Sequence, residues 1–362
     1  MTPQEEALRQ VRRAIRGMDG YVPGLQPAPG QRLVKLNTNE NPFPPSPRVI
    51  EALRAAADGT LRLYPSPDAA PLREQAAVTY GLRPSQVLCG NGSDEILAML
   101  MRSFVDKGET VAAFEPSYSL YPVLARIGGA RLVTVPLRRV ARREEMNEIP
   151  VPSPRAKVFF LTSPNSPYGC AFPAAWTERL LERFRGIVVA DEAYVDFDEG
   201  SALPLLAGSP RLVIVRTLSK AYSLAGMRVG LAFAHEDLVR EIMKVKDSYN
   251  VSRLAQAAAC AALADEPYFR TTRDAVKATR DRFSAALAAR GFTVLPSQAN
   301  FVFAVPPASI TARALYDRLL ARGFLVRHLS GAAVSDGLRI SMGTAADMDD
   351  LAAVMGEALH GG

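Results

Sequence analysis

The sequence is poor in the residues that staple small secreted domains and build metal sites. Its 362 residues include only three cysteines, Cys89, Cys170 and Cys260, and no two of them form a CxxC pair. This spacing argues against a disulfide framework and favours a reducing compartment. The three histidines are equally dispersed. We therefore expect neither a disulfide scaffold nor a bound metal.

Long hydrophobic runs are also missing, and we expect no targeting leader. The longest apolar stretch, residues 254–264, is interrupted by Gln256 and is shorter than the roughly 20 residues that a bilayer requires. Residues 1–6 carry no basic-then-apolar pattern. We therefore expect a soluble, cytoplasmic protein with no membrane partner.

Lysine is scarce, whereas arginine is abundant. The 43 basic residues comprise 36 arginines and 7 lysines, and the net charge is +6. A basic balance is typical of nucleic-acid partners, but these arginines are scattered and usually have acids nearby. The densest group, within 138–143, is followed at once by Glu144, Glu145 and Glu148, as on a solvated face. We expect no nucleic-acid partner.

What is present is typical of a globular α/β protein. Hydrophobic residues make up 48% of the chain and charged residues 22%, values that exclude disordered and collagen-like classes, and the length predicts about two domains. Residues 4–18 have the spacing of an amphipathic helix, and seven prolines between 23 and 47 predict an extended arm without regular structure. Beyond it, helical segments alternate with short apolar runs. The predicted strands are 87–89, 110–114, 132–135, 158–161, 187–190, 212–215 and 229–233.

This alternation predicts a mainly parallel sheet with helices on both faces. A long helical region over 253–290 and a second set of short strands follow, as in a smaller α+β domain. We therefore predict three parts: a helix and arm over 1–48, a large domain over 49–255 and a small domain over 256–362.

Polar residues that follow the predicted strands are candidates for a site, because ligands of open α/β sheets bind at the carboxyl ends of strands. The turn 90–94 exposes backbone N–H groups that bind anions, or it is an ordinary helix start. Asp191 could ligate a metal, act as a base, pair with a cationic ring or only cap a helix. Lys220, among hydroxyls and eight residues before Arg228, is either a surface lysine or a desolvated amine that forms a Schiff base.

Together these features point to one cofactor. An anion-binding turn, an acid at a strand end and a hydroxyl-flanked lysine 29 residues later are the three parts that pyridoxal 5′-phosphate requires. The lysine holds the aldehyde, the acid keeps the pyridine nitrogen protonated, and the turn anchors the phosphate. A binding protein without catalysis would lack the lysine or the acid, and both are present.

Specific motifs then carry a family resemblance that runs nearly end to end. They include Asn-Glu-Asn-Pro at 39–42, Ser-Pro-Asn-Ser-Pro at 163–167, Asp-Glu-Ala-Tyr at 191–194 and Thr-Leu-Ser-Lys at 217–220 with Arg228. The sequence resembles the fold-type I pyridoxal-phosphate-dependent aminotransferases, and within them the histidinol-phosphate aminotransferase group. The resemblance implies a mainly parallel central sheet, a smaller α+β domain and a homodimer with shared active sites.

The resemblance also implies roles for individual residues. Lys220 would bind the cofactor and move the proton, and Asp191 would pair with the ring nitrogen. Tyr194 and Asn165 would contact the ring hydroxyl of the cofactor, and Tyr118 would lie on the ring face. The phosphate would be held by Ser93, Asp94, Arg228 and either Thr217 or Ser219. Tyr64 would reach the phosphate in the neighbouring subunit. Arg339 would bind the anionic end of the substrate, helped by Arg327 and Tyr21, with Asn39 of the arm as a further candidate unless it only satisfies backbone groups.

The implied reaction moves the amino group of histidinol phosphate to 2-oxoglutarate, giving imidazole-acetol phosphate and glutamate in histidine biosynthesis. Two alternatives share the scaffold: an aromatic amino-acid aminotransferase and, less expected, a threonine-phosphate decarboxylase. The chain departs from the family pattern twice. Tyr168 stands where a small hydroxyl residue is usual, and the loop 328–337 lacks the common proline. Because that loop borders the anionic end of the substrate, its change leaves the substrate identity open.

Overall fold

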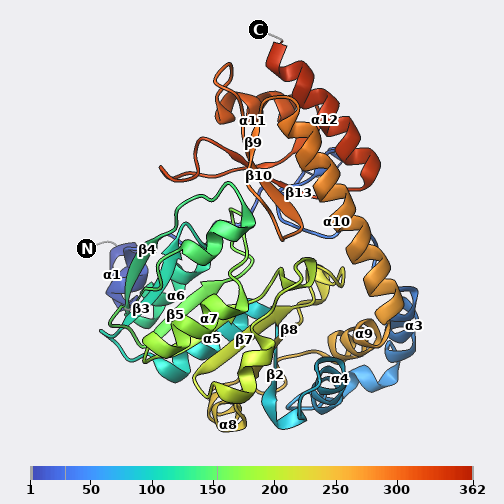
Figure 1. The fold of residues 1–362 in the computed structure, drawn as a ribbon. Coiled ribbons are helices and arrows are strands. Elements are labelled where there is room, and N and C mark those ends of the chain that lie inside the picture. The colour runs from blue at the N-terminus through green and yellow to red at the C-terminus, as the bar shows by residue number, and fades with distance from the viewer. Residues whose placement is uncertain (1–2, 29, 153, 361–362) are drawn as a thin grey trace.

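The computed structural model of the chain describes residues 3–28, 30–152 and 154–360. Two sheets organise most of it, one low and one high in the view of Figure 1. The helices are α1 Pro3–Gln10, α2 Arg13–Arg16, α3 Pro47–Ala56, α4 Ala70–Tyr80, α5 Ser93–Phe104, α6 Leu120–Gly128, α7 Ala174–Arg183, α8 Glu236–Met243, α9 Arg253–Ala264, α10 Glu266–Ala288, α11 Ala312–Ala321 and α12 Ala345–His360. The strands are β1 Val34–Lys35, β2 Val87–Gly90, β3 Thr110–Glu115, β4 Arg131–Pro136, β5 Val158–Thr162, β6 Ile187–Asp191, β7 Leu212–Thr217, β8 Gly230–Ala234, β9 Thr293–Val294, β10 Phe301–Val305, β11 Phe324–Leu325, β12 Arg327–His328 and β13 Leu338–Ser341.

The larger sheet has seven strands in the order β2-β8-β7-β6-β5-β3-β4. All of its pairs are parallel except those of β8, which runs antiparallel to both β2 and β7. Because β2 and β7 are both antiparallel to β8, they run in the same direction, and their carboxyl ends lie at one edge of the sheet. The seven apolar runs predicted as strands are confirmed, as is the mainly parallel α/β class.

Both faces of this sheet are buried, and the strand residues alternate between two cores. Val111 and Ala113 of β3 belong to a core with residues of α5, α6 and α8, whereas Ala112 and Phe114 belong to a core with residues of α4, α7 and α9. This alternation explains why the strands read as continuous apolar runs. Each large side chain buried in this way stabilises the fold by about 1.5–3 kcal/mol.

The second sheet is antiparallel, in the order β12-β13-β10-β9, and shares a core with α10, α11 and α12. The helix α10 has 23 residues and runs from the first sheet's helices to the second sheet (Figure 1). The helical region predicted over 253–290 is broken at Asp265, between α9 and α10. Pro267 occupies the first turn of α10, where its missing N–H group is not needed.

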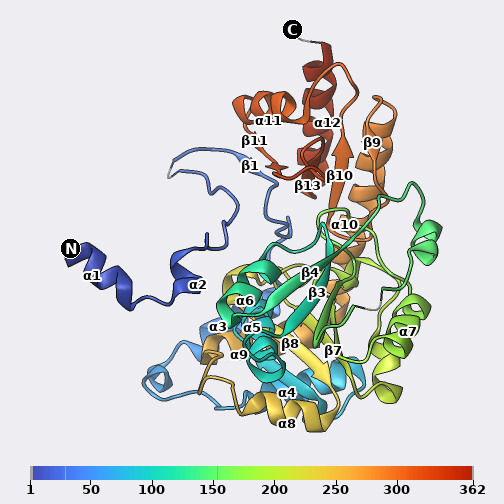
Figure 2. The same cartoon turned by 90° about the vertical axis from the view of Figure 1, so that its left-hand side faces the viewer.

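The N-terminal segment differs from the prediction in two respects. The helix expected over 4–18 is divided into α1 and α2, and α1 projects from the side of the molecule in Figure 2. The prediction of no regular structure between 23 and 47 is wrong at β1, which pairs in parallel with β11. Residues 30–41 contain no proline, so the N–H groups of Val34 and Leu36 are free to donate to Gly323 and Leu325.

Two points concern the limits of the described chain and its helices. Pro29, one of the seven arm prolines, and the first two residues of the expected leader-free start lie outside the described residues. No helix within the described ranges is long and apolar enough to cross a membrane.

Candidate active site

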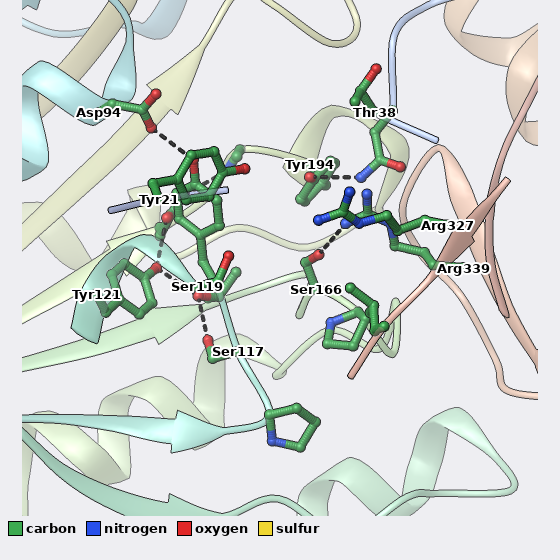
Figure 3. Close-up of a pocket in the computed structure, with 18 of the residues that line it drawn as sticks. Tyr21, Thr38, Asp94, Ser117, Ser119, Tyr121, Ser166, Tyr194, Arg327 and Arg339 are labelled. Carbon is green, nitrogen blue, oxygen red and sulfur yellow. Dashed lines mark hydrogen bonds between the residues drawn. The ribbon is translucent and has the colours of Figure 1, made fainter. Parts of the chain in front are cut away.

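The carboxyl ends of β2, β5, β6 and β7 and the arm surround one cavity of about 390 Å³ (Figure 3). Most of the predicted site residues line it, although they come from distant parts of the chain. They are Tyr21, Asn39, Ser93, Asp94, Tyr118, Asp191, Tyr194, Thr217, Ser219, Lys220, Arg228, Arg327 and Arg339. The exceptions are Asn165 and Tyr64.

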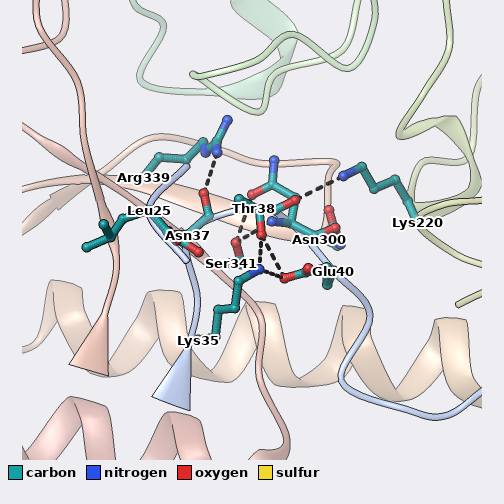
Figure 4. Close-up of polar contacts among 10 residues, drawn as sticks. Leu25, Lys35, Asn37, Thr38, Glu40, Lys220, Asn300, Arg339 and Ser341 are labelled. Carbon is teal, nitrogen blue, oxygen red and sulfur yellow. Dashed lines mark hydrogen bonds and ion pairs between the residues drawn. The ribbon is translucent and has the colours of Figure 1, made fainter. Parts of the chain in front are cut away.

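Lys220 lies in the turn after β7 and is partly buried. Its Nζ donates to the backbone carbonyl of Thr38, 3.0 Å away, as Figure 4 shows. Burial lowers the pKa of Lys220 to about 8, and the nearby Arg339 cation adds to this effect. The amide of Asn41 donates to the carbonyls of Lys220 and Ala221, which ties the turn to the arm. A lysine held this way is neutral in part near physiological pH.

Asp191 is the last residue of β6, and only 3% of it is exposed. Its carboxylate accepts hydrogen bonds from the Tyr121 hydroxyl at 2.7 Å and the Ala193 N–H at 3.3 Å. Within the described chain no cation forms an ion pair with it. Burial raises the pKa of Asp191 to about 6. A buried carboxylate without a counter-ion favours a ligand that brings a cationic N–H group.

Tyr121 and Thr162 are site residues that sequence reasoning missed. The Tyr121 hydroxyl lies 2.6 Å from Thr162 Oγ1 and orients the Asp191 carboxylate. Two signals were available. Thr162 ends β5, so it satisfies the strand-end criterion, and Tyr121 follows Tyr118 by three residues at the start of α6.

The turn before α5 forms the anion-binding end of the cavity. Gly92 has φ +86°, and no side chain in the described part of the chain caps the first N–H groups of the helix. Arg228 reaches both Asp94 Oδ2, at 3.3 Å, and Ser219 Oγ, at 3.5 Å. The Asp94 carboxylate also accepts from Tyr118. Because a carboxylate repels phosphate, Asp94 can hold an anion only through its backbone N–H group, while its side chain orients Arg228 and Tyr118.

The opposite end of the cavity holds two guanidinium groups, Arg327 and Arg339, which lie side by side in Figure 3. They are cross-strand neighbours on β12 and β13. Arg339 donates to Ser166 Oγ at 3.2 Å and to the Asn37 carbonyl at 2.8 Å, while its buried Nε has no hydrogen-bond partner among the residues that the structure describes. Burial lowers the pKa of Arg339, and the Arg327 cation contributes. Among the described residues neither arginine has a carboxylate partner, so this end favours an anion.

The arm joins the two ends through Asn39. Asn39 has φ +57°, which Asn tolerates better than most residues. Its amide donates to the Tyr194 hydroxyl at 2.9 Å, and its own N–H donates to Ser341 Oγ. Asn300 donates to its carbonyl. Asn39 therefore connects the second sheet to the cavity wall and does more than satisfy its own backbone.

Two predicted residues lie outside the cavity. The amide of Asn165 is occupied by the Pro116 carbonyl and the Tyr168 N–H group. Tyr64 is 77% exposed, and its ring stacks on Tyr249 with centroids 4.4 Å apart. Their predicted cofactor contacts stay predictions.

Comparison with known proteins identifies the family. Residues 31–355 match the model of aminotransferase class I and II. The chain belongs to this family. Two relatives named histidinol-phosphate aminotransferase are 44% and 45% identical to it. The first, from Syntrophotalea carbinolica, covers 97% of this chain and 99% of its own length, and the second, from Geobacter sulfurreducens, 95% and 97%.

A solved structure gives the same result for this member of the class I and II aminotransferases. The crystal structure of histidinol-phosphate aminotransferase from Sinorhizobium meliloti, in complex with pyridoxal-5′-phosphate, matches it with a TM-score of 0.86 and 28% identity. The match covers 97% of this chain and 98% of that one. The family resemblance and the fold-type I class expected from the sequence are confirmed.

Proposed function

We propose that this aminotransferase uses pyridoxal 5′-phosphate to move the amino group of histidinol phosphate to 2-oxoglutarate, giving imidazole-acetol phosphate and glutamate. The observation that carries the proposal is the cavity with two anion-binding ends, Arg228 at one and the Arg327–Arg339 pair at the other, lined also by Lys220 and Asp191. The histidinol-phosphate aminotransferases at 44% and 45% identity support it.

The residues of the cavity fit this cofactor. Among the described residues no cation pairs with the buried Asp191 carboxylate, and the protonated ring nitrogen would supply one; the uncapped start of α5 beside Arg228 suits the phosphate. Tyr118 would lie on the ring, with Tyr194 at the ring hydroxyl; Asn165, which lies outside the cavity lining, stays a predicted contact. When bound, the cofactor supplies an electron-accepting ring that stabilises negative charge at the substrate carbon.

Lys220 is the group that attaches the cofactor and afterwards takes up and returns the substrate proton at Nζ. Its pKa of about 8 makes both protonation states accessible near neutral pH, as a group that serves as base and acid requires. The Thr38 carbonyl holds the amine until the cofactor arrives. Tyr121 keeps Asp191 oriented throughout, since its hydroxyl donates to that carboxylate.

The Arg327–Arg339 pair binds the anionic end of each substrate. A planar guanidinium pairs bidentately with either a carboxylate or a phosphate, so one site serves both 2-oxoglutarate and a phosphorylated amine. Tyr21 lines the cavity beside Tyr118, since the two rings meet edge-on with centroids 6.0 Å apart. Arg339→Ala should raise KM for both substrates.

The enzyme is further proposed to be a cytoplasmic homodimer in which Tyr64 reaches the cofactor phosphate of the partner's site. The exposure of Tyr64 and its neighbours Leu61, Leu63 and Tyr249 supports this, because large apolar side chains exposed together mark contact surfaces. The division into an arm over 1–48, a large domain over 49–255 and a small domain over 256–362 also remains a proposal.

Amino-group exchange with different oxo acids tests the function. Purified protein is mixed with pyridoxal phosphate, glutamate and either imidazole-acetol phosphate or phenylpyruvate, and exchange is measured. Faster turnover with imidazole-acetol phosphate supports the proposal. The reverse order indicates the aromatic amino-acid aminotransferase, and release of carbon dioxide from threonine phosphate indicates the decarboxylase.

A further inference from the structure

The two departures from the family pattern meet in space. Tyr168 belongs to the turn after β5, and its hydroxyl donates to the Ala333 carbonyl at 3.0 Å, although 165 residues separate them. Arg139, which follows β4, donates to the same carbonyl at 2.6 Å. Its guanidinium also grips Asp336 through both carboxylate oxygens, at 2.8 and 2.5 Å. We refer to Arg139, Tyr168 and Asp336 as the clamp.

Through Asp336 and the Ala333 carbonyl, the clamp holds the segment 329–336, which is all but the last residue of the connection between β12 and β13. Arg327 and Arg339 flank this segment as cross-strand neighbours, so it is the loop of the hairpin that carries both substrate-binding cations. Leu329, Ser330 and Val334 of the segment line the cavity. Fixing the segment therefore fixes a cavity wall and the positions of the two guanidinium groups.

Other contacts also hold the segment: Leu329 packs against the core of the first sheet, and the Ser335 carbonyl lies 3.0 Å from His328 Nε2. Val334 is 6% exposed and packs in the core of the first sheet, whereas most of its neighbours in the segment are exposed. The clamp adds a polar anchor, on the outer side. Anchors on two sides of one short loop restrict its rotation, which apolar packing of Val334 and Leu329 alone does not.

Aromatic contacts and an ion pair fix the orientation of the Arg139 guanidinium. The Arg139 guanidinium lies 5.5 Å from the Tyr168 ring centroid and 5.2 Å from that of Phe303, so two aromatic rings fix its plane. The hydrogen bond from Arg139 holds the pKa of Asp336 below its usual value, so the pair stays charged at neutral pH. The Arg139 side chain is 30% exposed and that of Asp336 is 52% exposed, so a single ion pair between them would be weak. The two parallel hydrogen bonds to the Asp336 carboxylate and the third to the Ala333 carbonyl strengthen it.

We propose that Arg139, Tyr168 and Asp336 are positioning residues that hold the segment 329–336 as a wall of the substrate pocket and thereby set the affinity for anionic substrates. None of the three lines the cavity, so they act through Val334, Arg327 and Arg339. The inference rests on the proposed function, because it assigns the wall to that substrate site.

Steady-state kinetics of Arg139→Gln, Asp336→Asn and the double variant test the clamp. We expect KM for histidinol phosphate and 2-oxoglutarate to rise about three- to tenfold in each single variant, with kcat within about twofold. The double variant should resemble the singles, because the two residues act as one pair. Tyr168→Phe keeps the ring beneath Arg139 and should raise KM less. Asp317→Asn, which breaks the exposed Arg313–Asp317 pair on α11, is the matched control.

Unchanged KM in both single variants, or effects that multiply in the double variant, would overturn the proposal. Hydrogen exchange of peptides covering 329–337 gives a readout that does not depend on the substrate. Val334 and Ser335 donate their N–H groups to the Gly331 carbonyl, and these should exchange faster in Arg139→Gln and Asp336→Asn than in wild type and Asp317→Asn. Equal exchange contradicts the clamp. Turnover of phenylpyruvate in preference to imidazole-acetol phosphate contradicts the proposed function only.

Discussion

Three side chains in the cavity are buried in surroundings that disfavour their charged forms. Burial lowers the pKa of Lys220 and Arg339 and raises that of Asp191. None of the three forms an ion pair within the described chain. A ligand that brings a ring cation to Asp191 and an anion to Arg339 removes these unfavourable terms on binding. The free protein is therefore organised for a ligand of that charge pattern.

Attachment of the cofactor should depend on pH through Lys220. Only the neutral amine attacks an aldehyde, and a pKa of about 8 means that roughly a tenth of the amine is neutral at pH 7 and roughly nine tenths at pH 9. The attachment rate to the cofactor-free protein, followed by absorbance, should rise over that range. Lys220→Ala should retain no cofactor after borohydride treatment. A flat rate between pH 7 and 9 contradicts the assignment.

Asp191→Asn should stabilise the cofactor-free protein while it weakens cofactor binding. The folded-state pKa of about 6 lies above the ordinary value of 3.8, so the folded protein binds this proton more tightly than the unfolded chain does. Ionisation therefore destabilises the fold as pH rises from about 4 to 6, by roughly 3 kcal/mol at most. We expect Asp191→Asn to unfold at higher urea concentration than wild type at pH 7 and at a similar concentration near pH 4.

In the cofactor-loaded enzyme, the same Asp191→Asn substitution should impair function. Without a carboxylate the ring nitrogen loses its counter-charge, and turnover should fall on the order of a hundredfold. If cofactor-free Asp191→Asn and wild type unfold at the same urea concentration at pH 7, the ionised Asp191 carboxylate does not destabilise the wild-type fold, which contradicts the stability prediction.

At the scale of elements, strands buried on both faces were the most predictable part of the fold. Runs such as 158–161 and 212–215 are apolar at every position, a composition typical of strands buried on both faces. The two-residue strand β1 could not be predicted, because it exists only by pairing with β11, almost 300 residues away. Tyr168 illustrates the same limit in the site. Its departure was visible in the sequence, but its partner Ala333 is a backbone carbonyl, which has no sequence signal.

The contact between β8 and the turn before α5 predicts a steric effect. A Cβ at Gly230 would lie 2.5 Å from both the carbonyl carbon of Gly92 and the N atom of Ser93, closer than real Cβ atoms approach backbone. Gly230→Ala should therefore displace the anion-binding turn and raise the dissociation constant of the cofactor about tenfold or more. Gly226→Ala, where a Cβ meets nothing within 4 Å, is the control. Equal affinities in fluorescence titrations of the two variants would contradict this.

At the scale of the whole molecule, the proposed dimer allows complementation between inactive variants. Lys220→Ala and Tyr64→Ala homodimers each lack one part of every site. A mixed dimer has one site with both defects and one native site, provided that Tyr64 serves the partner. Refolding an equal mixture should restore roughly a quarter of the wild-type sites, because half of the dimers are mixed. A mixture no more active than the mean of the two separate variants would place Tyr64 elsewhere.

The bond from Lys220 to the Thr38 carbonyl also determines which positions tolerate substitution. A carbonyl is present whatever the residue, so a library of variants at position 38 should retain cofactor attachment. Position 39 should not be as tolerant, since the carbonyl is aimed by a backbone with φ +57° at Asn39 and by bonds from Asn300 and Ser341. The residue whose carbonyl accepts from the reactive amine should thus tolerate substitution better than its neighbour Asn39.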